Sequence, residues 1–555
     1  QLTARGQNSG NSVRTRLDDH VPPKPNYDAP CDYELKMTPE LPAELFICRL
    51  FQIFKSIQRT YPRRIVVTYP TSYTRFELSQ VVNAVYNAWK LAERFNPHGQ
   101  LSPQEVIPLA VDEATAAAFF YLARFVLEGP GGLRTFRWLY PDGFYLLVYD
   151  CGGATTDISL VHAVSKEQDT LSFSVLGRTG LRDFGGDEIT VATFLLLKTK
   201  LACSLVTARG GSSRHLPTVK PGDHQKVKEL RACLTDEQFL HECDRYVPTD
   251  FDLYSLSSGT DVRKALTLAL WDLAEAVKQG IKDAVAPRER VIDYLKRYHA
   301  TNVSASEIKR AVETLTVSYQ EIDAIVLPQV EKSVRVCKAL LESKLEFRAG
   351  LVDDIFIIGN GSRYPLIVEQ LRNSLMGETT TLDSQKSADD SFSLIVDTSD
   401  IKHAVAKGAA LALAMKESAL GIRIEFDDDL SNRLPFSIAW FNAASRSHIV
   451  LFEEGQPYDQ LEPRSIDVFP QKDGRKLEWI RLEHQWPGGN YEKFLLFHFP
   501  HGVEGEVIIS FDPEQRQFIA QSTQTGELVV AQREIDPSVY LAPVQRGKIR
   551  LPAIS

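Results

Sequence analysis

The stretch that decides the fold is Tyr149-Asp150-Cys151-Gly152-Gly153-Ala154-Thr155-Thr156-Asp157. Apolar residues before it and strand-forming residues after it predict two strands, and the small residues between them predict a tight turn. The absent side chains of Gly152 and Gly153 would let backbone N–H groups approach phosphate oxygens closely. Asp150 and Asp157 flank the turn, and Mg²⁺ is usually held by one or two carboxylates together with phosphates. The stretch therefore indicates a phosphate clamp, although a plain β-hairpin has the same pattern.

Three further segments place glycine or a carboxylate at the junction between a strand and a helix. Phe184-Gly185-Gly186-Asp187 opens one predicted helix, and Gly359-Asn360-Gly361-Ser362-Arg363 joins a buried strand to another. In Val111–Ala118, Glu113 begins an Ala-rich helix that is expected to pack tightly. Helix N-termini at such junctions present free N–H groups to anions and nucleotides. Each segment alone is more often structural, and an acidic first turn is simply favourable helix electrostatics.

Strands and helices alternate around these segments, which predicts a layered α/β domain. The expected strands are 63–68, 105–111, 144–150, 156–162 and 352–358. The expected helices are 76–95, 113–127, 262–284, 304–314, 318–344, 362–376 and 401–419. Between about 202 and 260 the periodicity is lost, and Gly210-Gly211-Ser212-Ser213 indicates an inserted segment. Residues 377–400 are expected to form a polar excursion.

After Gly421 the pattern changes to short strands separated by turn residues. The expected strands are 435–441, 447–452, 465–469, 477–483, 494–499, 505–511, 516–521 and 527–532. Strands at this spacing predict an all-β sandwich or barrel. The expected domains are an irregular leader 1–40, an α/β domain 41–420, a linker 421–433 that contains the acidic stretch Glu425–Asp429, a β-domain 434–540 and a tail 541–555.

The composition limits the partners. Of the 555 residues 43% are hydrophobic and 24% are charged, and the net charge is -9. A chain of this length holds more than one core, and its acidic balance offers no basic field to nucleic acid or to an anionic membrane. Its apolar runs are strand-sized, too short to span a bilayer. The seven cysteines are scattered without a CxxC pair, which favours reduced thiols and a cytoplasmic location.

Taken together and in this order, the segments resemble the DnaK-type heat-shock chaperone ATPases of the actin-like superfamily. Asp150–Asp157 resembles the family's Asp-Leu-Gly-Gly-Gly-Thr-Phe-Asp loop, and Asp112–Ala118 resembles its Asn-Glu-Pro-Thr-Ala-Ala-Ala. Phe184–Asp187 is similar to Leu-Gly-Gly-Glu, and Gly359–Pro365 is similar to Gly-Gly-x-Thr-Arg-x-Pro. The resemblance covers residues from about 41 to 536, interrupted by the insertion.

The resemblance implies an actin-like (ribonuclease H-like) two-lobed ATPase domain followed by an all-β sandwich domain. It implies ATP or ADP bound with Mg²⁺, the metal being held by Asp150 and Asp157. The implied catalytic residues are Glu113, Asp150, Thr155 and Asp157. The implied nucleotide-binding residues are Gly152, Gly153, Ala154, Gly185, Gly186, Glu275, Lys278, Gly359, Asn360, Gly361 and Arg363. The β-domain, in which Leu434–Ile438 resembles the family's first strand, would bind a client polypeptide or a protein-complex partner.

The chain departs from the family in three ways. The family's first phosphate loop, Asp-x-Gly-Thr-Thr, and a lysine that assists hydrolysis have no match, and we expect this segment to be missing from the sequence rather than from the protein. Ala154 and Asn360 replace glycines, and Thr156 replaces phenylalanine. After Tyr540 no amphipathic pattern predicts the family's helical lid. These departures favour the alternative function, a non-hydrolysing scaffold subunit of a larger complex. A sugar kinase or an actin-like filament protein would lack the β-domain.

Overall fold

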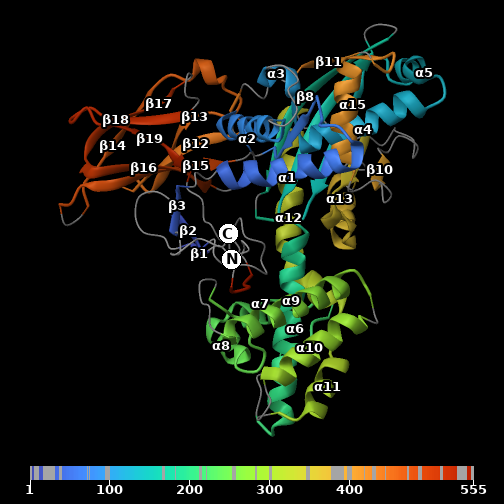
Figure 1. The fold of residues 1–555 in the computed structure, drawn as a ribbon, viewed down its shortest axis with the longest axis vertical. Coiled ribbons are helices and arrows are strands. Elements are labelled where there is room, and N and C mark those ends of the chain that lie inside the picture. The colour runs from blue at the N-terminus through green and yellow to red at the C-terminus, as the bar shows by residue number, and fades with distance from the viewer. Residues whose placement is uncertain are drawn as a thin grey trace, which may run out of the picture. The chain divides into compact units, whose positions relative to one another are not determined.

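In the computed structural model the described residues are 3–4, 12–16, 32–36, 40–71, 73, 75–93, 101–165, 169–181, 183–211, 216–220, 222–252, 258–281, 284–298, 303–345, 351–376, 393–396, 403–417, 419–427, 433–434, 436–443, 445–471, 474–485, 491–512, 517–533 and 547–551. Contacts divide the chain into two compact units, which are Gln1–Tyr69 with Tyr73–Asp112, and Pro70–Ser72 with Glu113–Ser555. Figure 1 labels the helices and strands.

The first unit is built from two long helices and two small sheets. Its elements are β1 (Thr3–Ala4), β2 (Ser12–Arg16), β3 (Asp32–Lys36), α1 (Glu40–Gln58), β4 (Val66–Tyr69), α2 (Arg75–Glu93), α3 (Pro103–Val106) and β5 (Leu109–Asp112). Helices α1 and α2 pack around Cys48, Phe51 and Trp89. Strands β4 and β5 pair in parallel, while β1, β2 and β3 form an antiparallel sheet inside the expected leader.

The sequence predicts a strand over 105–111, and the structure corrects the first half of this prediction. Pro103–Val106 is a short helix, and only Leu109–Asp112 is a strand. Ser102 caps the helix by accepting the N–H of Glu105, whose side chain accepts the N–H of Ser102 in return. This reciprocal cap satisfies two N–H groups that would otherwise be unpaired.

Helix α1 has a second apolar face that no described residue of the first unit covers. Phe46 and Ile57 are 65% and 69% exposed, and Leu50 and Ile53 lie between them at nearly half exposure. These positions recur every three or four residues, so they form one stripe along the helix. A contiguous exposed apolar surface of this kind marks an interaction site.

The second unit contains a six-stranded sheet in the order β10-β9-β6-β7-β8-β11. Its strands are β6 (Phe144–Cys151), β7 (Thr156–Ser165), β8 (Thr170–Leu181), β9 (Asp354–Ile358), β10 (Ser393–Val396) and β11 (Arg423–Asp427). Strands β6, β9 and β10 run parallel, β7 is antiparallel to both of its neighbours, and β11 is parallel to β8. The strands predicted at 144–150, 156–162 and 352–358 are confirmed, whereas β8, β10 and β11 are not predicted. The rest of the expected excursion 377–400 lies outside the described residues.

Helices cover both faces of this sheet. They include α4 (Glu113–Glu128), α6 (Gly186–Ala208), α12 (Tyr319–Lys344), α13 (Pro365–Met376) and α15 (Ala404–Lys416). Successive strand residues point to opposite faces. On β6, Leu147 joins the core formed with α6 and α12, whereas Phe144 stacks against Tyr121 of α4. Helix α15 crosses α4 so closely that a side-chain carbon at Gly408 would overlap the carbonyl oxygen of Ala116. The tight packing predicted from the alanines of α4 is confirmed.

Helices α7–α11 pack with α6 into a helical subdomain (Figure 1). They are α7 (His224–Thr235), α8 (Glu237–Asp244), α9 (Ser258–Lys278), α10 (Val285–Tyr298) and α11 (Ala305–Glu313). Helices α7 and α8 lie in the segment where the sequence loses periodicity, and they bury Leu234 and Leu240. Helix α9 ends at Lys278 instead of 284 because Gly280 adopts a left-handed φ of 74°. Among the described residues α6 alone is long and apolar enough to cross a membrane, but 78% of its apolar window is buried within the fold.

The C-terminal region contains two antiparallel sheets. Their orders are β13-β12-β15-β16-β20 and β14-β17-β18-β19. The strands are β12 (Ser437–Asn442), β13 (Ser447–Phe452), β14 (Arg464–Val468), β15 (Leu477–Gln485), β16 (Tyr491–Val503), β17 (Gly505–Asp512), β18 (Gln517–Ser522), β19 (Leu528–Val530) and β20 (Gln532–Arg533). Ile480 and Phe497 of one sheet share a core with Ile466 and Val507 of the other. Seven of the eight predicted strands are confirmed, whereas the predicted strand 527–532 is divided into β19 and β20, which belong to different sheets. The prediction that no helical lid follows Tyr540 falls largely outside the described residues.

The predicted linker 421–433 is wrong in its first part. Residues Arg423–Asp427 form β11, which pairs with β8 at the edge of the six-stranded sheet. Phe426 packs against the rings of Phe119 and Phe173, with ring centroids 5.1 and 5.8 Å away. The acidic stretch therefore begins as a strand of the α/β part of the chain, and residues 428–432 lie outside the described residues.

Candidate functional site

The turn after β6 and the turn before α6 are joined by backbone hydrogen bonds. The N–H of Gly186 donates to the carbonyl of Gly152 at 2.9 Å, and the N–H of Asp187 donates to the carbonyl of Gly153 at 2.7 Å. The N–H of Gly152 closes its own turn on the carbonyl of Thr155 at 2.9 Å. Two segments predicted as separate phosphate contacts thus lie side by side.

The turn after β9 packs backbone to backbone against the end of β6. Gly359 has a φ of 82°, and a side-chain carbon there would collide with the carbonyl oxygen of Cys151 and with Asp150. A side-chain carbon at Gly361 would lie 2.7 Å from both the Cys151 sulfur and the carbonyl oxygen of Gly152. Because backbone atoms cannot move aside, these two positions require glycine. The third predicted contact therefore belongs to the same site.

The tip of the first turn faces outward. Gly153 and Ala154 are exposed, and within the described part of the chain their N–H groups have no hydrogen-bond partner. Successive N–H groups in a turn form a concave site for an anion. Ala154, expected to be a glycine from the resemblance, causes no backbone strain here, because it does not have a positive φ. The same holds for Asn360, which is also exposed.

Carboxylates gather beside this turn. Asp150 and Asp157 are direct cross-strand partners. Burial, together with the charges of Asp157 and Glu113, raises the pKa of Asp150 well above its ordinary value. Like charges at a buried position are unfavourable unless one group is protonated or a cation neutralises them. The charges of Glu113 and Asp157 therefore make ionisation of Asp150 unfavourable.

Asp157 is already hydrogen-bonded within the protein. Its Oδ1 accepts the N–H and the hydroxyl of Thr71 at 2.8 and 2.5 Å, and its Oδ2 accepts the hydroxyl of Thr155 at 3.1 Å. Thr155 would thus have to exchange this partner in order to contact a phosphate. Thr71 was missed in the sequence because it follows a strand without any motif of its own, and only the folded chain places it here.

Lys278 of α9 anchors the second turn. Its Nζ donates to the carbonyl of Gly186 at 3.2 Å, to the hydroxyl of Thr190 at 2.8 Å and to Oε1 of Glu275 at 2.7 Å. Thr190 also donates to Glu275. The predicted pair Glu275 and Lys278 is therefore brought to the glycine turns. Thr190 carries no sequence signal, since threonine inside a helix more often bonds its own backbone.

The remaining residues of the three turns differ in how deeply they are buried. Arg363 is exposed at the end of the third turn, which is fixed by a 2.7 Å hydrogen bond from the Tyr364 hydroxyl to Asp323. Gly185 packs against the backbone of Gly153 with no room for a side chain. Cys151 is fully buried, and burial raises the pKa of its thiol to about 12. A buried thiol with a raised pKa is a poor nucleophile, so Cys151 serves as a small core residue.

The residues fit a hydrated magnesium ion better than a fully protein-ligated one. No group of three or more His, Cys, Asp or Glu side chains among the described residues could hold a metal directly. Mg²⁺ commonly keeps several waters and uses one or two carboxylates with substrate phosphates. Burial, with the charges of Asp157 and Glu113, raises the pKa of Asp150, and either protonation or a nearby cation would relieve this effect.

No family model matches the chain, and no curated protein matches it.

Proposed function

We propose that this chain is a divergent DnaK-type chaperone-like protein of the cytoplasm. Its actin-like domain binds and hydrolyses Mg-ATP, and it couples the nucleotide state to polypeptide binding by the C-terminal β-domain. The observation that carries the proposal is the exposed pair of N–H groups at Gly153 and Ala154, set beside Asp150, Asp157 and Glu113. The phosphate groups would match the N–H groups, and their cation would match the carboxylates.

Each group has a role in this proposal. The N–H groups of Gly153 and Ala154 bind phosphate oxygens, and Asp150 and Asp157 hold water molecules of the Mg²⁺ shell. When bound, the ion neutralises charge that develops on the phosphates. Glu113 orients the water that attacks the terminal phosphorus, releasing ADP and phosphate. Such catalysis depends mainly on positioning and on charge stabilisation.

Glu275 and Lys278 would support the nucleoside. In support of this role, Lys278 of α9 contacts the carbonyl of Gly186 in the second turn and pairs with Glu275. The third turn, with Gly359, Gly361 and exposed Arg363, would border the base. These roles come from the family resemblance, and the convergence of the turns supports them.

Lys332 of α12 supports the coupling to the β-domain. Its Nζ lies 3.2 Å from Asp183, which closely precedes the second turn, and 3.8 Å from Glu492 of β16. A further ion pair joins Lys344 of α12 to Glu454 at 3.1 Å. If nucleotide binding shifts the second turn, the shift would reach Lys332, which also contacts the β-domain. Lys332 would then link the nucleotide site to the polypeptide site.

Calorimetry tests the binding step. The wild-type chain should bind Mg-ATP, and Gly153→Val should weaken binding at least ~tenfold, because the valine covers the N–H groups. The fold should tolerate this variant, since the nearest atom to a side-chain carbon at Gly153 lies 3.6 Å away. Gly259→Ala, at an open position, is the matched control. Absence of any Mg-ATP binding by the wild-type chain would exclude the proposal.

Hydrolysis is tested separately. Glu113→Gln keeps the shape of the side chain and should slow turnover ~10²-fold or more while Mg-ATP still binds. Thr155→Ala should also slow turnover. Unchanged turnover in both variants would remove these residues from the mechanism.

A specific observation favours the scaffold alternative. The exposed stripe of α1, formed by Phe46, Leu50, Ile53 and Ile57, is a surface suited to a protein partner. In addition, Asp157 is saturated by Thr71 and Thr155, as expected of a structural carboxylate. A chain that binds no nucleotide but loses its complex on Phe46→Ser and Ile57→Ser would be a scaffold.

A further inference from the structure

Residues 547–551 are bound by the helical subdomain. The N–H of Phe251 donates to the carbonyl of Gly547 at 2.8 Å. Ile549 is only 4% exposed and belongs to the large core that includes α6 and α9. Lys548, between them, is exposed. Residues 547–551 thus bind through a backbone hydrogen bond at Gly547, where the chain bends with a φ of 79°, and through the buried side chain of Ile549.

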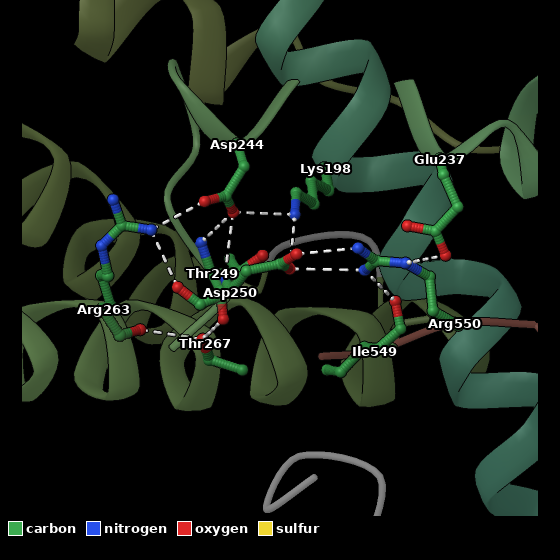
Figure 2. A network of polar contacts seen from close by, with 9 residues as sticks. All are labelled: Lys198, Glu237, Asp244, Thr249, Asp250, Arg263, Thr267, Ile549 and Arg550. Carbon is green, nitrogen blue, oxygen red and sulfur yellow. Dashed lines mark hydrogen bonds and ion pairs between the residues drawn. The ribbon is translucent and has the colours of Figure 1, made fainter. Parts of the chain in front are cut away.

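Arg550 adds a charged anchor. Its two terminal nitrogens contact Asp250 at 2.7 and 3.3 Å, and its Nε contacts Glu237 of α8 at 3.3 Å (Figure 2). Paired hydrogen bonds from a guanidinium to a carboxylate are strong and directional. Burial raises the pKa of Asp250, but the hydrogen bond from Arg550 and the charge of Lys198 outweigh it and leave that pKa below its ordinary value.

The surface that receives Arg550 is held in place by other residues. Lys198 of α6, 1% exposed, contacts Asp244 at 3.0 Å and Asp250 at 3.1 Å. Arg263 of α9 contacts Asp244 at 2.7 Å and the carbonyl of Asp250 at 2.8 Å. Asp244 also accepts the N–H groups of Thr249 and Asp250. Figure 2 shows this network meeting Arg550 at the carboxylate of Asp250.

The network keeps its charge balance without Arg550. Lys198 and Arg263 are two cations, and Asp244 and Asp250 are two carboxylates, joined by the ion pairs above. Departure of Arg550 would leave no buried carboxylate without a partner, which is the usual obstacle to opening a buried ion pair. The site can therefore exist empty as well as filled.

We infer that Asp250, Phe251 and Glu237 form a peptide site for a Gly-x-Ile-Arg segment, and that the chain's own segment 547–551 is its resident ligand, a releasable latch. In sequence the β-domain lies between β11 and this latch. The segment before the β-domain is held by the six-stranded sheet through β11, and the segment after it is held by the helical subdomain through the latch. Release of the latch frees the second of these attachments. This inference does not depend on nucleotide binding.

Hydrogen exchange of the full chain tests the inference. The Phe251 amide, which bonds to Gly547, should exchange about tenfold faster or more in Arg550→Gln and in Ile549→Asn than in the wild type. Lys548→Gln, at the exposed position, is the matched control and should leave the rate unchanged. Exchange in α6 should be the same in all four chains, which verifies that the fold is intact.

A peptide arm tests the site itself. A synthetic peptide of residues 545–555, added to the Arg550→Gln chain, should restore protection of the Phe251 amide. The same peptide with Arg550→Gln should not restore it, and neither peptide should protect Asp250→Asn. If the wild-type peptide fails to restore protection, or if Arg550→Gln and Ile549→Asn leave exchange unchanged, the inference is overturned.

Discussion

Asp150 and Asp157 face each other directly across β6 and β7, one strand on either side of the exposed turn. With Glu113 nearby, burial and like charge raise the pKa of Asp150 well above its ordinary value. Ionisation of Asp150 is therefore unfavourable in the folded chain, and its effect on stability can be measured.

The first prediction concerns Asp150→Asn. Because the folded-state pKa of Asp150 lies above its ordinary 3.8, its contribution to stability is fully present below that pH and is lost as pH rises through the folded pKa. Asparagine cannot ionise, so the variant should be more stable than the wild type at pH 8 by about 1–2 kcal/mol. The difference should vanish toward pH 4. Urea unfolding from pH 4 to 8 without nucleotide measures it, and a wild type that is equally stable at pH 8 contradicts it.

The second prediction concerns Lys278→Met. The variant removes the contacts to Gly186, Thr190 and Glu275, so stability should fall by about 1–2 kcal/mol. Nucleotide affinity should fall with it, because the second turn loses its anchor. Lys309→Met is the matched control, since Lys309 makes only an exposed pair with Glu313. Thermal unfolding and calorimetry report the two effects, and equal behaviour of both variants would count against the anchoring role.

The third prediction concerns Gly361→Ala. The added carbon would lie 2.7 Å from the Cys151 sulfur and from the Gly152 backbone, so the third turn must move. Stability should fall by about 1–3 kcal/mol, as for other overpacked positions. Gly259→Ala meets nothing within 4 Å and should be neutral or slightly stabilising. Denaturant unfolding of the two variants measures this loss. A Gly361→Ala variant with unchanged stability would mean that the turns are less tightly packed than described.

The fourth prediction concerns Phe426→Ser. Removing this ring takes away the contacts with Phe119 and Phe173, and the edge strand β11 should detach more often. Hydrogen exchange in 423–427 should become faster, with a loss of about 1–3 kcal/mol in stability. Phe469→Ser, at a position 59% exposed, serves as the control and should change little. Slow exchange in 423–427 of the variant would show that backbone pairing alone holds the strand.

Local patterns were sufficient for much of the fold. Apolar and polar residues alternate clearly in the β-domain strands. The alanines of α4 predict a close helix crossing, and Gly408 of α15 lies at that crossing. Helices α7 and α10 were not predicted because charged residues dominate them, as in Pro287-Arg288-Glu289-Arg290. Strand β11 was missed because its acidic sequence resembles a linker, and its partner β8 lies far away in the chain.

The glycine turns of the site were predictable from the sequence, whereas the long-range hydrogen bonds that join them to other residues were not. The glycine turns are visible because close backbone approach leaves few alternatives to glycine at Gly359 and Gly361. Thr71 and Thr190 act through hydrogen bonds to residues distant in sequence, which no local pattern encodes. The same is true of Arg550, whose partner Asp250 is 300 residues away.

The pairing of β8 with β11 has a consequence for biosynthesis. While the chain is being made, the outer edge of β8 has no partner until Arg423–Asp427 emerges. Unpaired strand edges recruit other strands, and long-range pairing forms slowly. A fragment that stops before Arg423 would therefore tend to aggregate, however complete its helices are. The protein must be produced at least as far as Asp427 before the six-stranded sheet has its edge strand β11.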